Sequence, residues 1–227
     1  MTPHHSESAF NPLPTVLWVL AAALALPELA FLVGGSGFSG SDAGGMRINA
    51  IQMTAWIPDI VLTGSLSTVH WDQLYRLLTY SFVSASAVNA LFVLAFTLAL
   101  GKAASGVFSQ WGVAALFFGG AIGGAVAQTL LAAMPGQPPM ALIGGYPAAY
   151  GLIGGFTWLL WMRLRATGGN PARAFTLIGM LALFQLGFGL MFRSLTPDIL
   201  AEFAGFASGF FLSFLVSPGG LRRLRQR

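Results

Sequence analysis

The sequence contains no cysteine among its 227 residues, which excludes disulfides, thiolate metal sites and cysteine nucleophiles. Charged residues are also scarce. They make up 8% of the chain, against about 25% in an ordinary soluble domain, whereas 56% of the residues are hydrophobic. This composition excludes a soluble enzyme and a soluble binding module.

The positive charge gives no indication of nucleic-acid binding. The net charge of +4 comes from 11 basic residues that are dispersed or lie at the C-terminus, and no basic stripe is interleaved with aromatic residues. The chain also lacks a His-Glu-x-x-His zinc signature. We expect no cofactor and no metal. The partners that this composition favours are membrane lipids and other membrane proteins.

Apolar segments long enough to cross a bilayer dominate the chain, because a spanning helix needs about 20 apolar residues. We predict one all-α integral membrane domain over residues 1–227, with a tail at 1–12, a long outer loop at 35–79 and a basic tail at 217–227. Six transmembrane helices are expected, over residues 13–34, 80–100, 111–134, 140–162, 174–192 and 199–216.

The basic residues indicate the orientation, because cytoplasmic loops carry an excess of lysine and arginine. With the N-terminus inside, only Arg47, Arg76 and Arg193 fall on the outer side. The other eight basic residues fall on the inner side and are Lys102, Arg163, Arg165, Arg173, Arg222, Arg223, Arg225 and Arg227. We therefore predict that both termini are cytoplasmic. The expected location is the inner (cytoplasmic) membrane of a bacterium.

Glycines recur at four-residue spacing on three of the expected helices. This spacing puts bare backbone on one helix face, so that a neighbouring helix can approach closely. Packing alone is the plain interpretation of each pair, and the three helices together predict a tight bundle with a buried centre. The pairs are Gly119 with Gly123, Gly120 with Gly124, Gly151 with Gly155, and Gly205 with Gly209.

Three stretches together resemble the rhomboid family of intramembrane proteases. Residues 75–82, Tyr-Arg-Leu-Leu-Thr-Tyr-Ser-Phe, resemble the family's Trp-Arg loop motif and the start of its second helix. Residues 144–152, Gly-Gly-Tyr-Pro-Ala-Ala-Tyr-Gly-Leu, resemble the Gly-x-Ser-Gly-x-x-Tyr/Phe-Gly-Leu stretch of the fourth helix. Residues 201–209 resemble the Ala-His-x-x-Gly-x-x-x-Gly stretch of the sixth helix. The resemblance covers residues from about 70 to 217 and implies a six-helix rhomboid-like bundle.

The same resemblance implies that the family's chemical positions are changed in this chain. The position of the nucleophilic serine carries Tyr146, and the position of the general-base histidine carries Glu202. The two oxyanion-stabilising positions of the second helix carry Asn89 and Val93. In the loop motif the tryptophan is replaced by a tyrosine, and the arginine is retained; these two residues are Tyr75 and Arg76.

No other constellation replaces the missing serine and histidine, because a serine nucleophile needs a general base within hydrogen-bond reach. The histidines, His4, His5 and His70, lie in the tail and the outer loop, and the single lysine, Lys102, lies in an inner loop. We expect a rhomboid-like pseudoprotease that binds transmembrane segments or membrane-protein partners without cleaving them, in membrane-protein quality control or assembly. The alternatives are an intramembrane serine-type peptidase with unorthodox or residual activity, and an accessory structural subunit of a larger membrane complex.

Three further residues have two interpretations each. Asn89 either forms a hydrogen bond between helices or contacts a substrate. Tyr150 either packs in the core or lies, as the resemblance implies, beside the residue at the position of the catalytic histidine. Glu28, a carboxyl group within the first apolar segment, has either a structural or a functional role, since an intramembrane carboxyl group is costly to keep.

The start of the fourth helix leads to two more predictions. Pro147 suits the first turn of a helix, where its missing amide hydrogen is not needed, so the helix is expected to run from about Pro147 to Arg163 with Gly144 and Gly145 outside it. We also predict a hydrogen bond from the Tyr146 hydroxyl to the Glu202 carboxyl group, as a static link in place of a reactive pair.

Overall fold

The computed structural model describes residues 13–35, 43–61, 70–136, 140–192 and 198–217. The two tails, over residues 1–12 and 218–227, lie outside this part of the chain. Within the described ranges the regular structure is helical, apart from one isolated antiparallel bridge between Trp56 and Leu142. The α-helices are α1 (Thr15–Gly35), α2 (Ala43–Thr54), α3 (Pro58–Val61), α4 (Arg76–Thr79), α5 (Ala87–Ser105), α6 (Gln110–Ala132), α7 (Tyr146–Ala166), α8 (Thr176–Phe192) and α9 (Asp198–Val216).

Four of these helices, α1, α5, α6 and α9, are long and apolar enough to cross a membrane, and a shorter apolar stretch covers Pro171–Gln185. The chain is therefore a multi-pass membrane protein. Helix α7 has 21 residues but falls outside this group, because its glycines, its aromatic residues and its two arginines lower its mean hydropathy. It is instead the helix with the longest buried stretch, which runs from Pro147 to Gly155.

The second and fourth expected spans begin later than the sequence predicted. The second was expected from residue 80, but residues Tyr80–Phe82 form a short 3₁₀ turn, and α5 begins only after Ser86, whose side chain accepts a hydrogen bond from the Asn89 amide. The fourth was expected from residue 140, but the chain is non-helical up to Gly145. Two features keep this segment out of the helix: Leu142 pairs with Trp56 of the outer loop, and Gly144 has a φ of +94°, which a helix does not accommodate.

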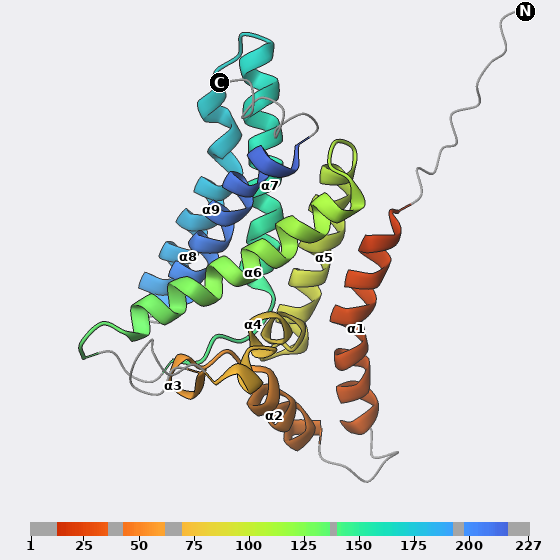
Figure 1. Ribbon diagram of the computed structural model, residues 1–227, viewed down its shortest axis with the longest axis vertical. Helices are drawn as coiled ribbons and strands as arrows, with labels where there is room; N and C mark the ends of the chain where they lie inside the picture. The colour runs from red at the N-terminus through yellow and green to blue at the C-terminus, as the bar shows by residue number, and fades with distance from the viewer. Residues whose placement is uncertain (1–12, 36–42, 62–69, 137–139, 193–197, 218–227) are drawn as a thin grey trace, which may run out of the picture.

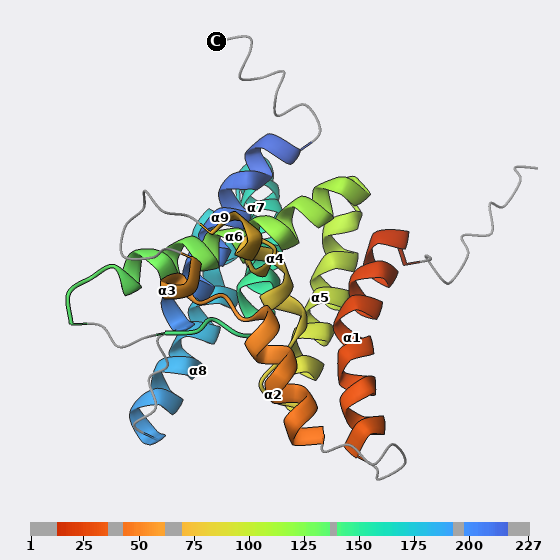
Figure 2. The ribbon, with the colours of Figure 1, turned by 60° about the horizontal axis from the view of Figure 1, so that its bottom comes forward.

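The helices form a bundle with α7 in contact with α5, α6 and α9. Figure 1 shows α7 between α9 and α5, with α6 crossing in front of it and α1 beside α5. Helices α2, α3 and α4, which belong to the long loop, gather at one end of the bundle, and the C-terminal ends of α5 and α7 lie at the other end (Figure 1). Figure 2 brings the first of these ends forward and shows α8 at the edge of the bundle.

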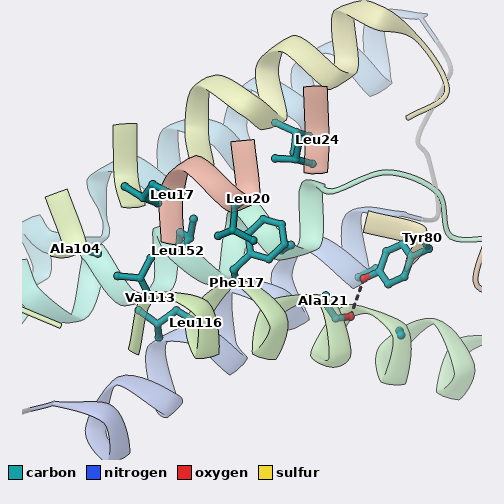
Figure 3. Packing of buried hydrophobic residues seen from close by; sticks show 14 of the residues in the cluster. Leu17, Leu20, Leu24, Tyr80, Ala104, Val113, Leu116, Phe117, Ala121 and Leu152 are labelled. Carbon is teal, nitrogen blue, oxygen red and sulfur yellow. Dashed lines mark hydrogen bonds between the residues drawn. The ribbon is translucent and has the colours of Figure 1, made fainter. Parts of the chain in front are cut away.

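The core contains buried side chains of α1, α5, α6 and α7 (Figure 3). Leu20 and Leu24 of α1, Phe117 of α6 and Leu152 of α7 are all buried there. Burial of such side chains stabilises the fold by about 1.5–3 kcal/mol each in water, whereas in lipid the gain comes from close packing. Tyr80 is also fully buried, and its hydroxyl donates a hydrogen bond of 2.7 Å to the carbonyl oxygen of Ala121.

Glycines bring the backbones of α6, α7 and α9 into contact. A Cβ atom added to Gly120 of α6 would lie 2.7 Å from the Cα atom of Gly151 of α7, which is closer than real side chains allow. The other glycines of the predicted pairs face neighbouring helices in the same way. Gly119 and Gly123 face Leu212 and Ser208 of α9, Gly155 faces Leu116 of α6, and Gly205 and Gly209 face Pro147 and Gly151 of α7.

Candidate functional site

The candidate site begins at the first turn of α7. Helix α7 starts at Tyr146, one residue before the predicted start, and Gly144 and Gly145 are non-helical as predicted. The amide of Gly144 donates a hydrogen bond of 3.0 Å to the carbonyl oxygen of Tyr80. A Cβ atom added to Gly145 would lie 2.7 Å from Cγ1 of Val93. The Val93 side chain, which is fully buried, therefore closes the space beside the backbone that precedes Tyr146.

Glu202 lies one turn into α9 and is buried, with 6% of its surface exposed. Its carboxylate accepts a hydrogen bond from the side-chain amide of Gln185 on α8. The Tyr150 hydroxyl of α7 also lies close to this carboxyl group. Glu202 therefore joins three helices, α7, α8 and α9.

The predicted hydrogen bond between Tyr146 and Glu202 is not formed among the described residues. Tyr146 is half-buried and lies close enough to Glu202 to interact with it electrostatically. Glu202 is instead bonded to Gln185 of α8, and Tyr150, one helical turn beyond Tyr146 on the same face of α7, also lies close to the carboxyl group. Sequence analysis missed Gln185 altogether. The available signal was a lone amide within the apolar segment 174–192, since polar side chains inside a membrane span usually have a specific partner.

Asn89, at the first of the two oxyanion positions on α5, forms no hydrogen bond to another described helix. The backbone amide of Asn89 donates a hydrogen bond of 3.3 Å to the Ser86 hydroxyl and so caps the start of α5. Its side chain is partly exposed and forms no hydrogen bond with any other residue that the structure describes. The interhelical hydrogen bond that was one interpretation of Asn89 is therefore absent from this part of the chain.

The tyrosine and arginine of the loop motif connect the C-terminal end of α2 to the start of α4. Arg76 is buried, with 8% of its surface exposed, and its Nη1 donates to the carbonyl oxygens of Gln52, at 2.7 Å, and Ala55, at 3.1 Å. The Tyr75 hydroxyl donates to the carbonyl oxygen of Met53 at 2.8 Å. These bonds satisfy carbonyl groups at the C-terminal end of α2, which have no partner within the helix.

Glu28 is paired with an arginine of the outer loop. Its carboxylate oxygens accept hydrogen bonds from Arg47 at 2.8 and 2.7 Å, and Nη1 of Arg47 also donates to the carbonyl oxygen of Ser84 at 2.7 Å. The guanidinium group lies 4.6 Å from the ring centroid of Phe31. This arrangement links α1, α2 and the segment before α5, and it gives the intramembrane carboxyl group a structural partner.

The described residues contain no group of three or more histidine, aspartate, glutamate or cysteine side chains that could hold a metal. The polar groups at the candidate site are phenol, amide and carboxyl groups from α7, α8 and α9. They can donate and accept hydrogen bonds, and Glu202 can also attract a positive charge.

Comparison with known protein families gives a match that contains this site. The family model of the Rhomboid domain matches residues 71–219, whereas no curated protein matches the chain. The matched region runs from the loop segment before α4 to the end of α9 and contains Tyr146, Gln185 and Glu202. It covers well over half of the chain, which therefore belongs to the rhomboid family.

Proposed function

We propose that this rhomboid-family protein is a pseudoprotease that binds transmembrane segments or membrane-protein partners without cleaving them, in membrane-protein quality control or assembly. The observation that carries the proposal is the set of contacts that the Glu202 carboxyl group makes. Its carboxyl group accepts a hydrogen bond from Gln185 and lies close to the Tyr150 hydroxyl, so the residue at the position of the general base is engaged with residues other than Tyr146.

The site also lacks a general base for Tyr146 and an oxyanion donor at Val93 among the described residues, and both features argue against hydrolysis. A hydroxyl nucleophile needs a general base within hydrogen-bond reach, and Tyr146 has no hydrogen bond to Glu202 within the described part of the chain. The described histidine, His70, lies in the outer loop with its Nδ1 atom 3.9 Å from a carboxylate oxygen of Asp72. The buried side chain of Val93 packs beside the backbone at Gly145, and a valine has no donor for an oxyanion.

We also propose six membrane crossings, with both termini in the cytoplasm of a bacterial cell and the chain in its inner membrane. The proposal adds α7 and α8 to the four apolar helices. Helix α7 is buried by its neighbours, so it needs fewer lipid-compatible side chains than a peripheral helix does. Lys102, Arg163 and Arg165 lie in the last turns of α5 and α7, at the end opposite to α2, α3 and α4 (Figure 1), as the positive-inside rule requires.

Site-specific photo-crosslinking in native membranes tests the binding function. A photoreactive residue at Leu183, which is 73% exposed on α8 two residues from Gln185, is compared with one at Trp18, which is 62% exposed on α1. We expect full-length membrane proteins to be captured from Leu183 and not from Trp18. Equal capture from both positions, or capture of cleaved fragments from Leu183, would contradict the proposal.

A further inference from the structure

The buried carboxyl group of the candidate site has hydrogen-bonding neighbours but no basic partner in the described part of the chain. Glu202 contacts the Gln185 amide and the Tyr150 hydroxyl. A carboxylate removed from water is costly unless a positive charge compensates it. Asp198, one turn earlier on α9, adds to the negative potential at Glu202.

The two described arginines of the outer loop have partners elsewhere. Arg47 is held by both oxygens of Glu28, and Arg76 is held by backbone carbonyl groups of the outer loop, among them that of Ala55. The remaining described basic residues lie at the other end of the bundle, in the last turns of α5 and α7 and in the 3₁₀ segment that follows α7. They are Lys102, Arg163, Arg165 and Arg173.

The side chain of Gln185 provides a further hydrogen-bond acceptor. Its Nε2 atom donates to Glu202, and its Oε1 atom is buried with no hydrogen-bond partner among the described residues. The cluster therefore has more acceptors than donors. A lysine ammonium group has three donors and an arginine guanidinium group has five, and neither has an acceptor, so a basic side chain matches this surplus in both charge and hydrogen bonding.

We infer that Glu202 and the free carbonyl oxygen of Gln185 form an acceptor site for a lysine or arginine side chain in the outer half of a client's transmembrane segment. The inference rests on the proposed function and specifies the chemistry of the client. Glu202 lies four residues into α9, about 6 Å along the helix axis from its start. A basic residue one or two turns inside the outer end of a client helix lies at the same depth in the membrane as Glu202. The apolar part of its long side chain can pack against the helices while the charged end reaches the carboxyl group.

The test uses the full chain in nanodiscs and three single-span peptides that are identical except at one position, one turn inside the outer end. That position carries lysine, leucine or glutamate. Binding is measured by fluorescence energy transfer for the wild-type protein and for Glu202→Gln, which keeps the side-chain shape and removes the charge. The matched control is Asp72→Asn, which removes a charge from an exposed loop residue whose side chain is 71% exposed.

We expect the wild-type protein to bind the lysine peptide at least about tenfold more tightly than the leucine peptide, as for other buried charge pairs. The Glu202→Gln variant should lose this preference, and Asp72→Asn should keep it. Equal binding of the lysine and leucine peptides by the wild-type protein overturns the inference and leaves the proposed function standing. Failure of all three peptides to bind overturns both.

A third variant tests whether the chain supplies its own counter-ion. Arg193 precedes α9 in the sequence but lies outside the described residues. A lysine preference that is already present in the wild-type protein and unchanged in Arg193→Gln supports the inference. A preference that arises only in Arg193→Gln means that Arg193 neutralises Glu202 in the wild-type protein, and it overturns the inference.

Discussion

Arg47 and Glu28 form a bidentate ion pair, with nitrogen–oxygen distances of 2.8 and 2.7 Å, between the outer loop and the first apolar helix. The pair explains how a carboxyl group is kept within that helix. It also couples α2 to the segment before α5, because Arg47 contacts the carbonyl oxygen of Ser84. Arg47 therefore joins the loop to the bundle, whereas Arg76 connects two parts of the loop with each other.

The ion pair leads to a first prediction. Glu28→Leu and Arg47→Leu should each lower the free energy of unfolding by about 2–3 kcal/mol, since each leaves a poorly solvated charge without its partner. This is less than a fully buried pair would give, because the two side chains keep 11% and 18% of their surface exposed. The double variant should cost clearly less than the sum of the two single variants. Additive losses in a thermal or steric-trapping measurement would contradict the coupling.

A second prediction concerns Arg76. Arg76→Lys should release the C-terminal end of α2, because one ammonium group cannot replace both the Nη1 bonds to Gln52 and Ala55 and the Nε bond to the Gln73 side chain. We expect protease sites within residues 43–61 to become accessible and stability to fall by about 1–3 kcal/mol. Arg173→Lys, at an exposed position in the 3₁₀ segment, is the control and should leave the digestion pattern unchanged. An unchanged pattern for Arg76→Lys would mean that α2 is held by other contacts.

A third prediction compares alanine substitutions at two glycines, one between helices and one with open space beside it. Gly151→Ala should lower stability by about 1–3 kcal/mol or more, because its Cβ atom would lie 2.8 Å from the Cα atom of Gly120. Gly179→Ala on α8 adds a Cβ atom with no described atom within 4 Å, so it should be neutral or slightly stabilising. Unfolding of both variants in the same lipid distinguishes the two cases. A tolerated Gly151→Ala would show that α6 and α7 are not in backbone contact.

A fourth prediction compares substitutions of Gln185 and Tyr146, two of the residues near Glu202. Gln185→Leu removes the hydrogen bond from α8 to α9, whereas Tyr146→Phe removes a hydroxyl group that has no bond to Glu202. Interhelical hydrogen bonds in membranes average about 0.6 kcal/mol. We therefore expect faster hydrogen exchange in α8 and a small loss of stability for Gln185→Leu alone. A larger loss of stability for Tyr146→Phe than for Gln185→Leu would mean that Tyr146, and not Gln185, forms the hydrogen bond to Glu202.

The topology leads to a fifth prediction. With six crossings and both termini inside, reporter fusions after Gly45, in the outer loop, and after Gly169, between α7 and α8, should report opposite sides of the membrane. An alkaline phosphatase and a fluorescent-protein fusion at each position give the two readouts. Signals from the same side would rule out this arrangement.

The sequence predicted the fold well where hydropathy and small-residue spacing determine it. The ends of α1, α6 and α9 lie within a few residues of the expected spans, and the glycines of α6, α7 and α9 lie between helices. Hydropathy could not place the start of α7, because residues 140–145 are kept out of the helix by a bridge to Trp56, a contact between distant parts of the chain.

The site was predicted less completely, for the same reason. Resemblance identified Tyr146 and Glu202, but the partners of a buried polar group depend on which helices pack around it. Gln185 is 17 residues from Glu202, and Arg47 is 19 residues from Glu28. Nothing in the local pattern relates these residues to each other. The one usable signal was the presence of a lone polar side chain in an apolar segment.

The absence of proteolysis is the central claim, and a cleavage assay with co-reconstituted single-span substrates tests it most directly. The wild-type protein and Glu202→Gln are incubated with the substrates in liposomes, and the products are identified by mass spectrometry. An active rhomboid protease run in parallel shows that the substrates can be cut. We predict intact substrate with both proteins. Fragments that form with the wild-type protein and are lost in Glu202→Gln would contradict this account and identify Glu202 as a catalytic residue.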